Sequence, residues 1–183
     1  MTELAILARD VGVNERTLRR AVNQGTLHAT RPTPRALELP LTERRYVRRS
    51  WSLVAALRVA LRTEQNVRFA LLFGSAATGT DTPASDVDIV VDMRDPSLER
   101  VVDLSTKLTA AIGRQVDVIR VQDAEADPLF FADVVADGRV LVDREELWRR
   151  LGGREAGLRR RGREQETDRA QAALAGIDRL LAS

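Results

Sequence analysis

The 183-residue sequence contains no cysteine and a single histidine, His28. The absence of thiols excludes disulfide bonds and every metal site that depends on thiolate ligands. No apolar run is long enough to span a bilayer, and no charged segment followed by an apolar one resembles a secretion signal. We therefore expect a cytoplasmic protein without a membrane partner, and we expect His28 in a surface or wing position.

Charge is unevenly distributed along the chain, although the net charge is only +2. Residues 1–50 carry ten arginines and five acidic residues, whereas residues 64–143 carry seven basic and fifteen acidic residues. Residues 144–183 again carry more arginines, ten against seven acidic residues. An acidic middle needs metal ions before it accepts a nucleotide, whereas a basic front end can contact nucleic acid directly. These parts are therefore expected to have different partners.

The stretch from Leu71 to Asp92 predicts two strands joined by a small-residue turn and a polar loop. Because side chains alternate between the faces of a strand, Asp86 and Asp88 project to one side at the start of the second strand. Adjacent carboxylates repel each other unless a cation lies between them, and a site with only oxygen ligands suits Mg²⁺. The alternative is a pair of carboxylates that caps a turn in solvent.

Small polar residues surround this pair of carboxylates. Gly74 and Ser75 leave the backbone bare after the first strand, so that its N–H groups can approach phosphate oxygens. Ser85 is a candidate for a further contact to a nucleotide, whereas Asp81 in the same loop is expected to be solvated. A phosphate-binding turn beside a metal-binding pair indicates phosphoryl or nucleotidyl transfer.

The same stretch resembles the signature of the DNA polymerase β-like nucleotidyltransferase superfamily, and within it the minimal nucleotidyltransferases. The family pattern is Gly-Ser, ten residues, then Asp-x-Asp. Here ten residues separate Gly74-Ser75 from the motif formed by Asp86 and Asp88. This fixed spacing favours a catalytic role for the carboxylates over the solvated alternative.

The resemblance extends over residues 66–148. The family adds a third carboxylate on a later strand, and Asp117 matches that place. The turn after Gly-Ser often contains arginine in the family, whereas this chain has Thr78 there. The departure removes a possible phosphate contact and bears on turnover and nucleotide affinity more than on the fold.

The resemblance implies a Mg²⁺-dependent enzyme that moves a nucleoside monophosphate, with AMP expected, from a nucleoside triphosphate such as ATP to a hydroxyl group. Two Mg²⁺ ions would be held by Asp86, Asp88 and Asp117, and Asp117 would also orient or deprotonate the hydroxyl. Gly74 and Ser75 would bind the β- and γ-phosphates. Family members of this size often act as antitoxins that adenylylate a HEPN-type ribonuclease toxin, which implies a HEPN-type protein partner.

The N-terminal residues predict two short helices, Glu3–Asp10 and Glu15–Asn23, with Gly12 between them and Asn14 as the N-cap of the second. Residues 27–30 and 36–39 predict two short strands around a tip with two prolines and flanking arginines. This arrangement resembles the excisionase and MerR-type winged helix-turn-helix, which implies DNA binding and is compatible with a homodimer. The candidate DNA-binding residues are Arg16, Thr17, Arg19, Arg20, Arg31 and Arg35. In the alternative interpretation, the two helices pack against the enzyme and the arginines are solvated.

The whole chain is predicted to have an α+β fold, with a winged helix-turn-helix followed by a small mixed-sheet nucleotidyltransferase with flanking helices and a C-terminal helical tail. Residues 1–41 form the DNA-binding module, 42–63 a connecting helix, 64–148 the nucleotidyltransferase domain and 149–183 the C-terminal helix. Further strands are expected at 115–121 and, as a sheet edge, at 139–143. Glycines and caps predict helices at 98–112, 128–137, 145–150 and 155–181.

Three other functions remain open at this stage. One is a DNA-binding regulator in which an inactive nucleotidyltransferase fold senses nucleotide, and Thr78 favours it. Another is a nucleotidyltransferase that acts on a small molecule or a tRNA, although such relatives usually carry a larger acceptor-binding domain. The last is an interaction scaffold built on the C-terminal helix.

Overall fold

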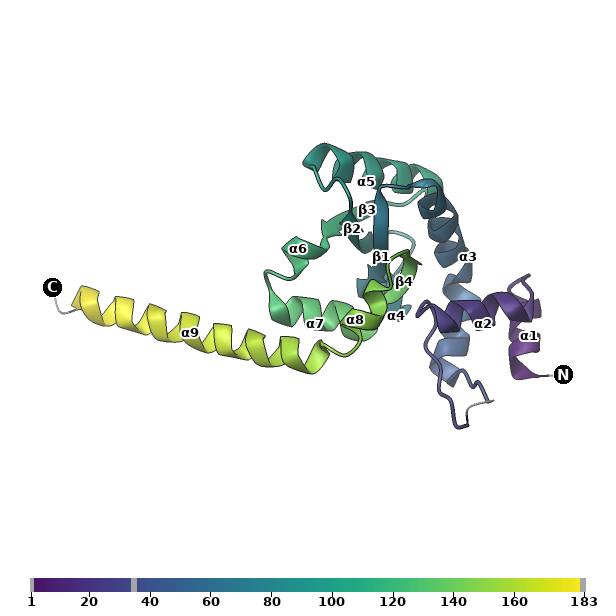
Figure 1. Ribbon diagram of the computed structural model, residues 1–183, viewed down its shortest axis with the longest axis horizontal. Coiled ribbons are helices and arrows are strands. Elements are labelled where there is room, and N and C mark those ends of the chain that lie inside the picture. Colours follow the sequence, from purple (N-terminus) through teal and green to yellow (C-terminus); the bar gives the residue numbers. More distant parts are fainter. Residues whose placement is uncertain (1, 34–35, 182–183) are drawn as a thin grey trace.

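The structure is a computed structural model that describes residues 2–33 and 36–181, and it has a mixed α+β fold (Figure 1). The strands are β1 (Val67–Phe73), β2 (Val87–Met93), β3 (Val116–Arg120) and β4 (Arg139–Asp143). The helices before the second strand are α1 (Glu3–Asp10), α2 (Glu15–Asn23), α3 (Leu41–Thr63) and α4 (Gly74–Thr78). Those after it are α5 (Leu98–Ile112), α6 (Val121–Ala124), α7 (Pro128–Asp137), α8 (Leu147–Leu151) and α9 (Glu155–Leu181).

The four strands form one mixed sheet in the order β3-β2-β1-β4. Strand β1 is antiparallel to both of its neighbours, whereas β2 and β3 are parallel. Alternate residues of β1 are buried on opposite faces: Leu72 packs into the core with α3 and α5, and Leu71 packs into the core with α7. A hydrophobic layer therefore covers each face, and β4 is the edge strand that the sequence predicts.

The N-terminal helices share a hydrophobic core with the sheet. Leu4, Leu18 and Leu27 belong to the same buried cluster as Val54 of α3 and Leu72 of β1. Helix α3 runs from the N-terminal module to the sheet without a break (Figure 1). The N-terminal module is thus packed against the sheet domain and is not attached through a flexible linker.

A buried ion pair joins these two parts. Arg139 of β4 donates to Glu43 of α3 through Nη1 at 2.6 Å and Nη2 at 3.0 Å, and both side chains are only 5% exposed. The backbone N–H of His28 donates to the same Glu43 carboxylate at 3.0 Å. The Arg139 guanidinium also lies over the Tyr46 ring, with 3.4 Å from Cζ to the ring centroid.

His28 was expected near the surface, and this expectation holds in part. Its ring is half-buried, and the Nε2 atom lies 3.2 Å from the Gly138 carbonyl oxygen.

We expect the substitution Glu43→Gln to lower the free energy of unfolding by about 3 kcal/mol, because it leaves the Arg139 charge buried without a counter-charge. Urea unfolding followed by circular dichroism measures this loss. The matched control is Glu15→Gln, which removes the same charge from the exposed pair of Glu15 with Arg19. An exposed pair contributes about 0–1 kcal/mol. Equal losses in the two variants would contradict the assigned role of the buried pair.

Most of the predicted elements are present with the predicted bounds. Helices α1, α2, α5, α7 and α9 and strand β4 match to the residue, and Asn14 caps α2 by accepting from the Thr17 N–H at 3.3 Å. The predicted wing is wrong in its extent. In place of two strands, residues 27–33 and 36–39 contain only one isolated bridge, between Thr30 and Glu38. Prolines in this segment remove backbone donors and thereby limit pairing.

Helix α9 extends beyond the body of the molecule (Figure 1). Its first half packs on α7, where Gly162 lies against Leu129 and Arg159 pairs with Asp133 at 3.0 Å. The second half carries exposed residues up to position 174. Among residues 2–33 and 36–181, none of the helices combines the length and the apolar composition that a bilayer span requires.

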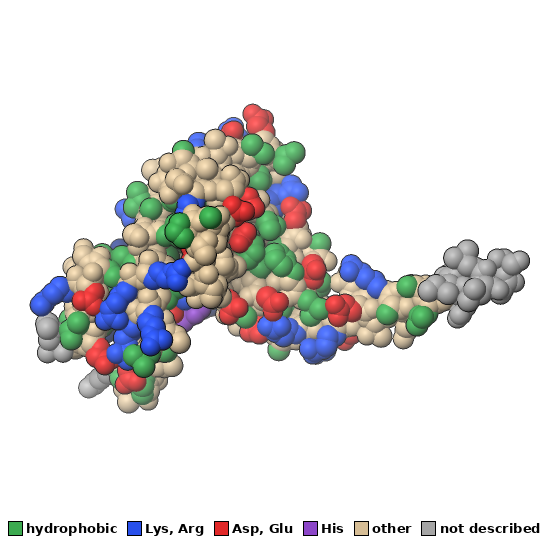
Figure 2. All heavy atoms as spheres, turned by 180° about the vertical axis from the view of Figure 1, so that it is seen from behind, with side chains coloured by type: hydrophobic (Ala, Val, Ile, Leu, Met, Phe, Trp, Pro, Cys, Tyr) green, Lys and Arg blue, Asp and Glu red, His purple; other side chains and the backbone are tan. Residues whose placement is uncertain are grey.

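The charge segregation of the sequence is visible on the molecular surface. Lys and Arg side chains gather over the N-terminal end in Figure 2, whereas acidic side chains are spread over the sheet domain and the start of α9. On this face the basic side chains are therefore concentrated at the N-terminal end, although acidic side chains lie among them.

Candidate active site

Three predicted carboxylates project from one face of the sheet at its α4 end. Asp88 lies opposite Phe73 of β1 and is in register with Asp117 of β3. Val87, Ile89, Val116 and Val118 turn to the opposite face, where they join the core with α3 and α5. Since alternate residues face opposite sides, Asp86, Asp88 and Asp117 share the other face. The structure thus brings together the acidic residues that the sequence singles out.

The three carboxylates influence one another electrostatically. Burial raises the pKa of the Asp88 carboxyl, and the charges of Asp117 and Asp86 raise this pKa further. Asp88 is half-buried, whereas Asp86 and Asp117 are exposed. The charge on Asp88 is therefore unfavourable in the absence of a cation, and a cation bound at these oxygens would relieve the repulsion.

The backbone of Gly74 lies directly against Asp88. A Cβ atom at Gly74 would lie 2.5 Å from Asp88 Oδ2, and Gly74 has φ of +69°, a conformation that residues with side chains rarely adopt. Gly74 begins helix α4, whereas the sequence predicts only a tight turn there, and no side chain caps this end of the helix. The first N–H groups of a helix lack partners within the helix, so they remain available to a phosphate oxygen.

The other end of α4 is held by side chains from distant elements. Arg139 Nε donates to the Ala77 carbonyl at 2.5 Å, and the Tyr46 hydroxyl donates to the Ala76 carbonyl at 3.2 Å. Burial raises the pKa of the Tyr46 phenol, which keeps its hydroxyl protonated as a donor. The orientation of Gly74 and Ser75 therefore depends on α3 and β4.

The donor set at this site fits a hard divalent cation. All of its candidate ligands are carboxylate oxygens, the ligand type that Mg²⁺ prefers. Within the described part of the chain, no three acidic or histidine side chains already stand in the close arrangement of a complete metal cage. The carboxylates on this face whose charges act on one another are Asp86, Asp88 and Asp117.

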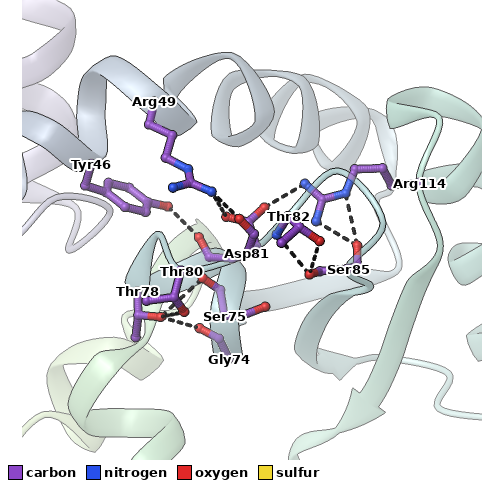
Figure 3. A network of polar contacts seen from close by, with 11 residues as sticks. Tyr46, Arg49, Gly74, Ser75, Thr78, Thr80, Asp81, Thr82, Ser85 and Arg114 are labelled. Carbon is purple, nitrogen blue, oxygen red and sulfur yellow. Dashed lines mark hydrogen bonds and ion pairs between the residues drawn. The ribbon is translucent and has the colours of Figure 1, made fainter.

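The loop before Asp86 is held by an ion-pair network (Figure 3). Arg114 Nη1 lies 2.8 Å from Asp81 Oδ2, while Arg114 Nη2 donates to the Ser85 carbonyl at 2.7 Å. Arg49 of α3 donates to the Asp81 carbonyl and lies 3.9 Å from its carboxylate. The expectation that Asp81 is solvated is wrong: Asp81 is 7% exposed, because two arginines draw it inward.

The hydroxyl groups of the loop contact one another. Ser85 Oγ accepts from the Thr82 N–H at 2.9 Å, which stabilises the turn before Asp86. Thr78 Oγ1 donates within α4 and lies 3.0 Å from Thr80 Oγ1 (Figure 3). In this arrangement Ser85 shapes the loop, so its predicted contact to a nucleotide has to compete with the bond to Thr82.

The predicted DNA-binding residues divide into two groups. Arg16, Thr17 and Arg20 line a groove beside α2, and all three are exposed. Arg19 lies elsewhere on the helix and pairs with Glu15 at 2.5 Å. Arg31 donates to Asn23 Oδ1 at 2.6 Å at the end of α2. The remaining candidate, Arg35, lies outside the described residues.

Sequence reasoning missed the residues that position the site from outside the motif: Tyr46, Arg49, Arg114 and Arg139. Their partners lie 29 to 96 residues away in the sequence. In the sequence, Arg114 stands just before a predicted strand and Arg139 stands at the start of another. Neither position indicates which residue the arginine contacts.

Two solved structures are similar to this chain. A solved structure described as a toxin–antitoxin with AMP-PNP has a TM-score of 0.52 and 21% identity, and the match covers 68% of this chain and 97% of that chain. A tri-AMPylated Shewanella oneidensis HEPN toxin in complex with its MNT antitoxin gives a TM-score of 0.45 and 18% identity, with 72% and 98% covered. The sequence matched no curated protein.

The first of these likenesses shows a common fold. The sequence itself gives the family, since residues 56–147 match the family described as polymerase beta, nucleotidyltransferase. This match spans half of the chain and contains Gly74, Ser75 and the three carboxylates. The chain belongs to the polymerase beta nucleotidyltransferase family and is a nucleotidyltransferase.

Proposed function

We propose that the enzyme transfers AMP from ATP to a hydroxyl group of a HEPN-type toxin and so acts as the antitoxin of a toxin–antitoxin pair. The observation that carries the proposal is the placement of Asp86, Asp88 and Asp117 on one face, beside the uncapped start of α4. The solved toxin–antitoxin structure with AMP-PNP, whose fold this chain shares, supports the choice of nucleotide and partner.

In the proposed reaction, the acceptor oxygen forms a bond to the α-phosphorus and the bond from that phosphorus to the β-phosphate bridging oxygen breaks. AMP is thereby joined to the acceptor, pyrophosphate leaves, and the hydroxyl proton passes to Asp117 or to solvent. Backbone N–H groups of Gly74 and Ser75 bind the β- and γ-phosphates. Two Mg²⁺ ions held by Asp86, Asp88 and Asp117 would neutralise the negative charge that develops on the phosphoryl oxygens.

The test uses the purified chain, Mg²⁺ and a purified HEPN-type protein as the acceptor. With [α-³²P]ATP the partner gains label, whereas with [γ-³²P]ATP it gains none and the label appears in pyrophosphate. Label from the γ position on the partner would mean phosphoryl transfer and would contradict the proposal. Mg²⁺-dependent binding of ATP without pyrophosphate release would instead identify the nucleotide-sensing regulator.

We further propose that the N-terminal module binds operator DNA. Support comes from the helix–turn–helix arrangement of α1 and α2 and from the exposed Arg16, Arg19 and Arg20. Arginine side chains read guanine edges and hold phosphates. A gel shift with the DNA upstream of the coding region tests this role. Binding that is unchanged in both Arg19→Ala and Arg20→Ala would reject it.

A further inference from the structure

A basic groove of about 1130 Å³ runs between α2, α3 and the segment formed by β4 and α8. Small-molecule pockets typically have about 300–1,000 Å³, so this groove has room for an oligomer. Its walls carry six arginines: Arg16 and Arg20 from α2, Arg58 and Arg62 from α3, and Arg144 and Arg149 from the β4–α8 segment. Positive charge therefore faces the groove from three elements.

Two carboxylates, Asp143 and Glu146, also line the groove, but most of the arginines form no ion pair with them. Among the described residues, the only one of these arginines with an acidic partner is Arg149, which lies 3.0 Å from Glu146. Arg58 and Arg144 donate to neutral oxygens instead. Burial lowers the pKa of Arg58, and the charges of Arg62 and Arg20 lower it further. The groove thus holds repelling cations that an anionic ligand would neutralise.

A side chain bridges one end of the groove. Arg58 of α3 crosses the groove, where Nη2 bonds to Gln24 Oε1 at 2.5 Å and Nη1 bonds to Thr26 Oγ1 at 2.6 Å. Gln24 and Thr26 lie directly after α2, so these bonds tie α2 to α3 along the groove.

An aromatic side chain stands at the edge of the same groove. Trp148 of α8 is half-buried and lies against Gly25, where an added Cβ would be 2.4 Å from Trp148 Nε1. Trp148 also borders a second hollow of about 750 Å³ that includes Arg31. Unpaired bases stack on aromatic rings, and Trp148 keeps part of its surface exposed at the groove. The amides of Asn14 and Asn23 in the groove wall can bond to base edges.

We propose that this groove binds single-stranded nucleic acid, with the phosphodiester backbone along the arginines and a base against Trp148. The inference deepens the nucleic-acid role proposed for the N-terminal module, because part of the binding surface belongs to the transferase core. RNA and DNA share the phosphodiester chemistry, and the sugar preference is read from the two probes below. Operator binding through Arg19 is a separate property, since Arg19 does not line the groove.

The experiment measures fluorescence anisotropy of labelled 12-nucleotide oligouridylate and oligothymidylate, and of a 12-base-pair duplex, with the full chain in EDTA so that metal-bound nucleotide sites do not contribute. The test variant is Arg62→Gln/Arg149→Gln, which lies outside the helix–turn–helix. The control is Arg161→Gln/Arg163→Gln, which removes the same charge from exposed positions of α9. Melting curves check the fold of both variants.

Each phosphate contact changes the slope of log K against log salt by about 0.7 for a single strand. Loss of two contacts in the test variant therefore reduces this slope by about 1.4. If the variant and the parent protein bind equally at 1 M salt, the variant binds about 25-fold more weakly than the parent at 0.1 M salt. The control variant is expected to bind within about twofold of the parent protein, since general charge acts weakly at this ionic strength. Equal losses in both variants, tighter binding of the duplex than of either strand, or equal competition by polyglutamate of the same charge would each overturn the proposal. Operator binding lost only in Arg19→Ala would leave it standing.

Discussion

The substitution Asp88→Asn is expected to abolish nucleotidyl transfer while it stabilises the metal-free protein. A metal ion contributes several kcal/mol of charge stabilisation to a phosphoryl transition state, and each 1.36 kcal/mol corresponds to a factor of ten in rate. Loss of the central ligand therefore lowers the transfer rate on the order of 10³-fold or more. Single-turnover transfer of label from [α-³²P]ATP, with Mg²⁺ in excess, measures the loss.

The stabilising effect follows from the raised pKa of Asp88. Because its pKa in the folded state lies above the value in the unfolded chain, the ionised form at pH 7 opposes folding. This cost declines as the pH falls below the folded-state pKa and is gone below the pKa of the unfolded chain. In EDTA at pH 7, Asp88→Asn should melt at a higher temperature than the parent, and the difference should shrink at lower pH. The control Asp103→Asn removes an exposed carboxylate of α5 and should keep its activity. An Asp88→Asn protein that transfers label normally would contradict the assigned role.

Alternation along the strands was enough to predict the shared face of the carboxylates. Val87 and Ile89 had to be buried, so Asp86 and Asp88 had to project to the other side. Alternation alone does not predict the strand register between β2 and β3, which places Asp117 beside Asp88. The prediction that these two residues lie together depended on the resemblance to a family.

The residues that support the motif escaped prediction because they act across the fold. Asp81 looked like an ordinary loop residue, and its burial comes from Arg114, 33 residues later, and Arg49, 32 residues earlier. Asp92 lies within β2 and pairs with Arg68 of β1 at 2.7 Å. Charged residues give no periodic signal of their partners, so neither contact follows from spacing.

The N-terminal segment illustrates a different limit. Caps and glycines fix helix ends locally, and both α1 and α2 end where these signals predict. A pair of short strands depends on cross-strand hydrogen bonds, and prolines at the tip reduce the number of donors. Local signals therefore predicted the helices well and overestimated the wing.

The substitution Gly74→Ala is expected to reduce transfer about 100-fold or more, because misplacement of a reacting group by about 1 Å costs that much. Its Cβ would lie 2.5 Å from Asp88 Oδ2, so either the carboxylate or the start of α4 has to move. The control is Gly113→Ala. Gly113 has nearly the same backbone conformation, with φ of +68° against +69°, but no atom lies within 4 Å of an added Cβ.

Both alanine variants have to adopt a left-handed backbone conformation, which costs roughly 1–2 kcal/mol in each. Their melting temperatures should therefore fall by similar amounts, whereas only Gly74→Ala should lose activity. Transfer rates at saturating ATP and Mg²⁺ separate the two effects, since the shared backbone cost cancels in the comparison. If both variants lost activity equally, strain alone would explain the result. The close approach between Gly74 and Asp88 would then have no part in catalysis.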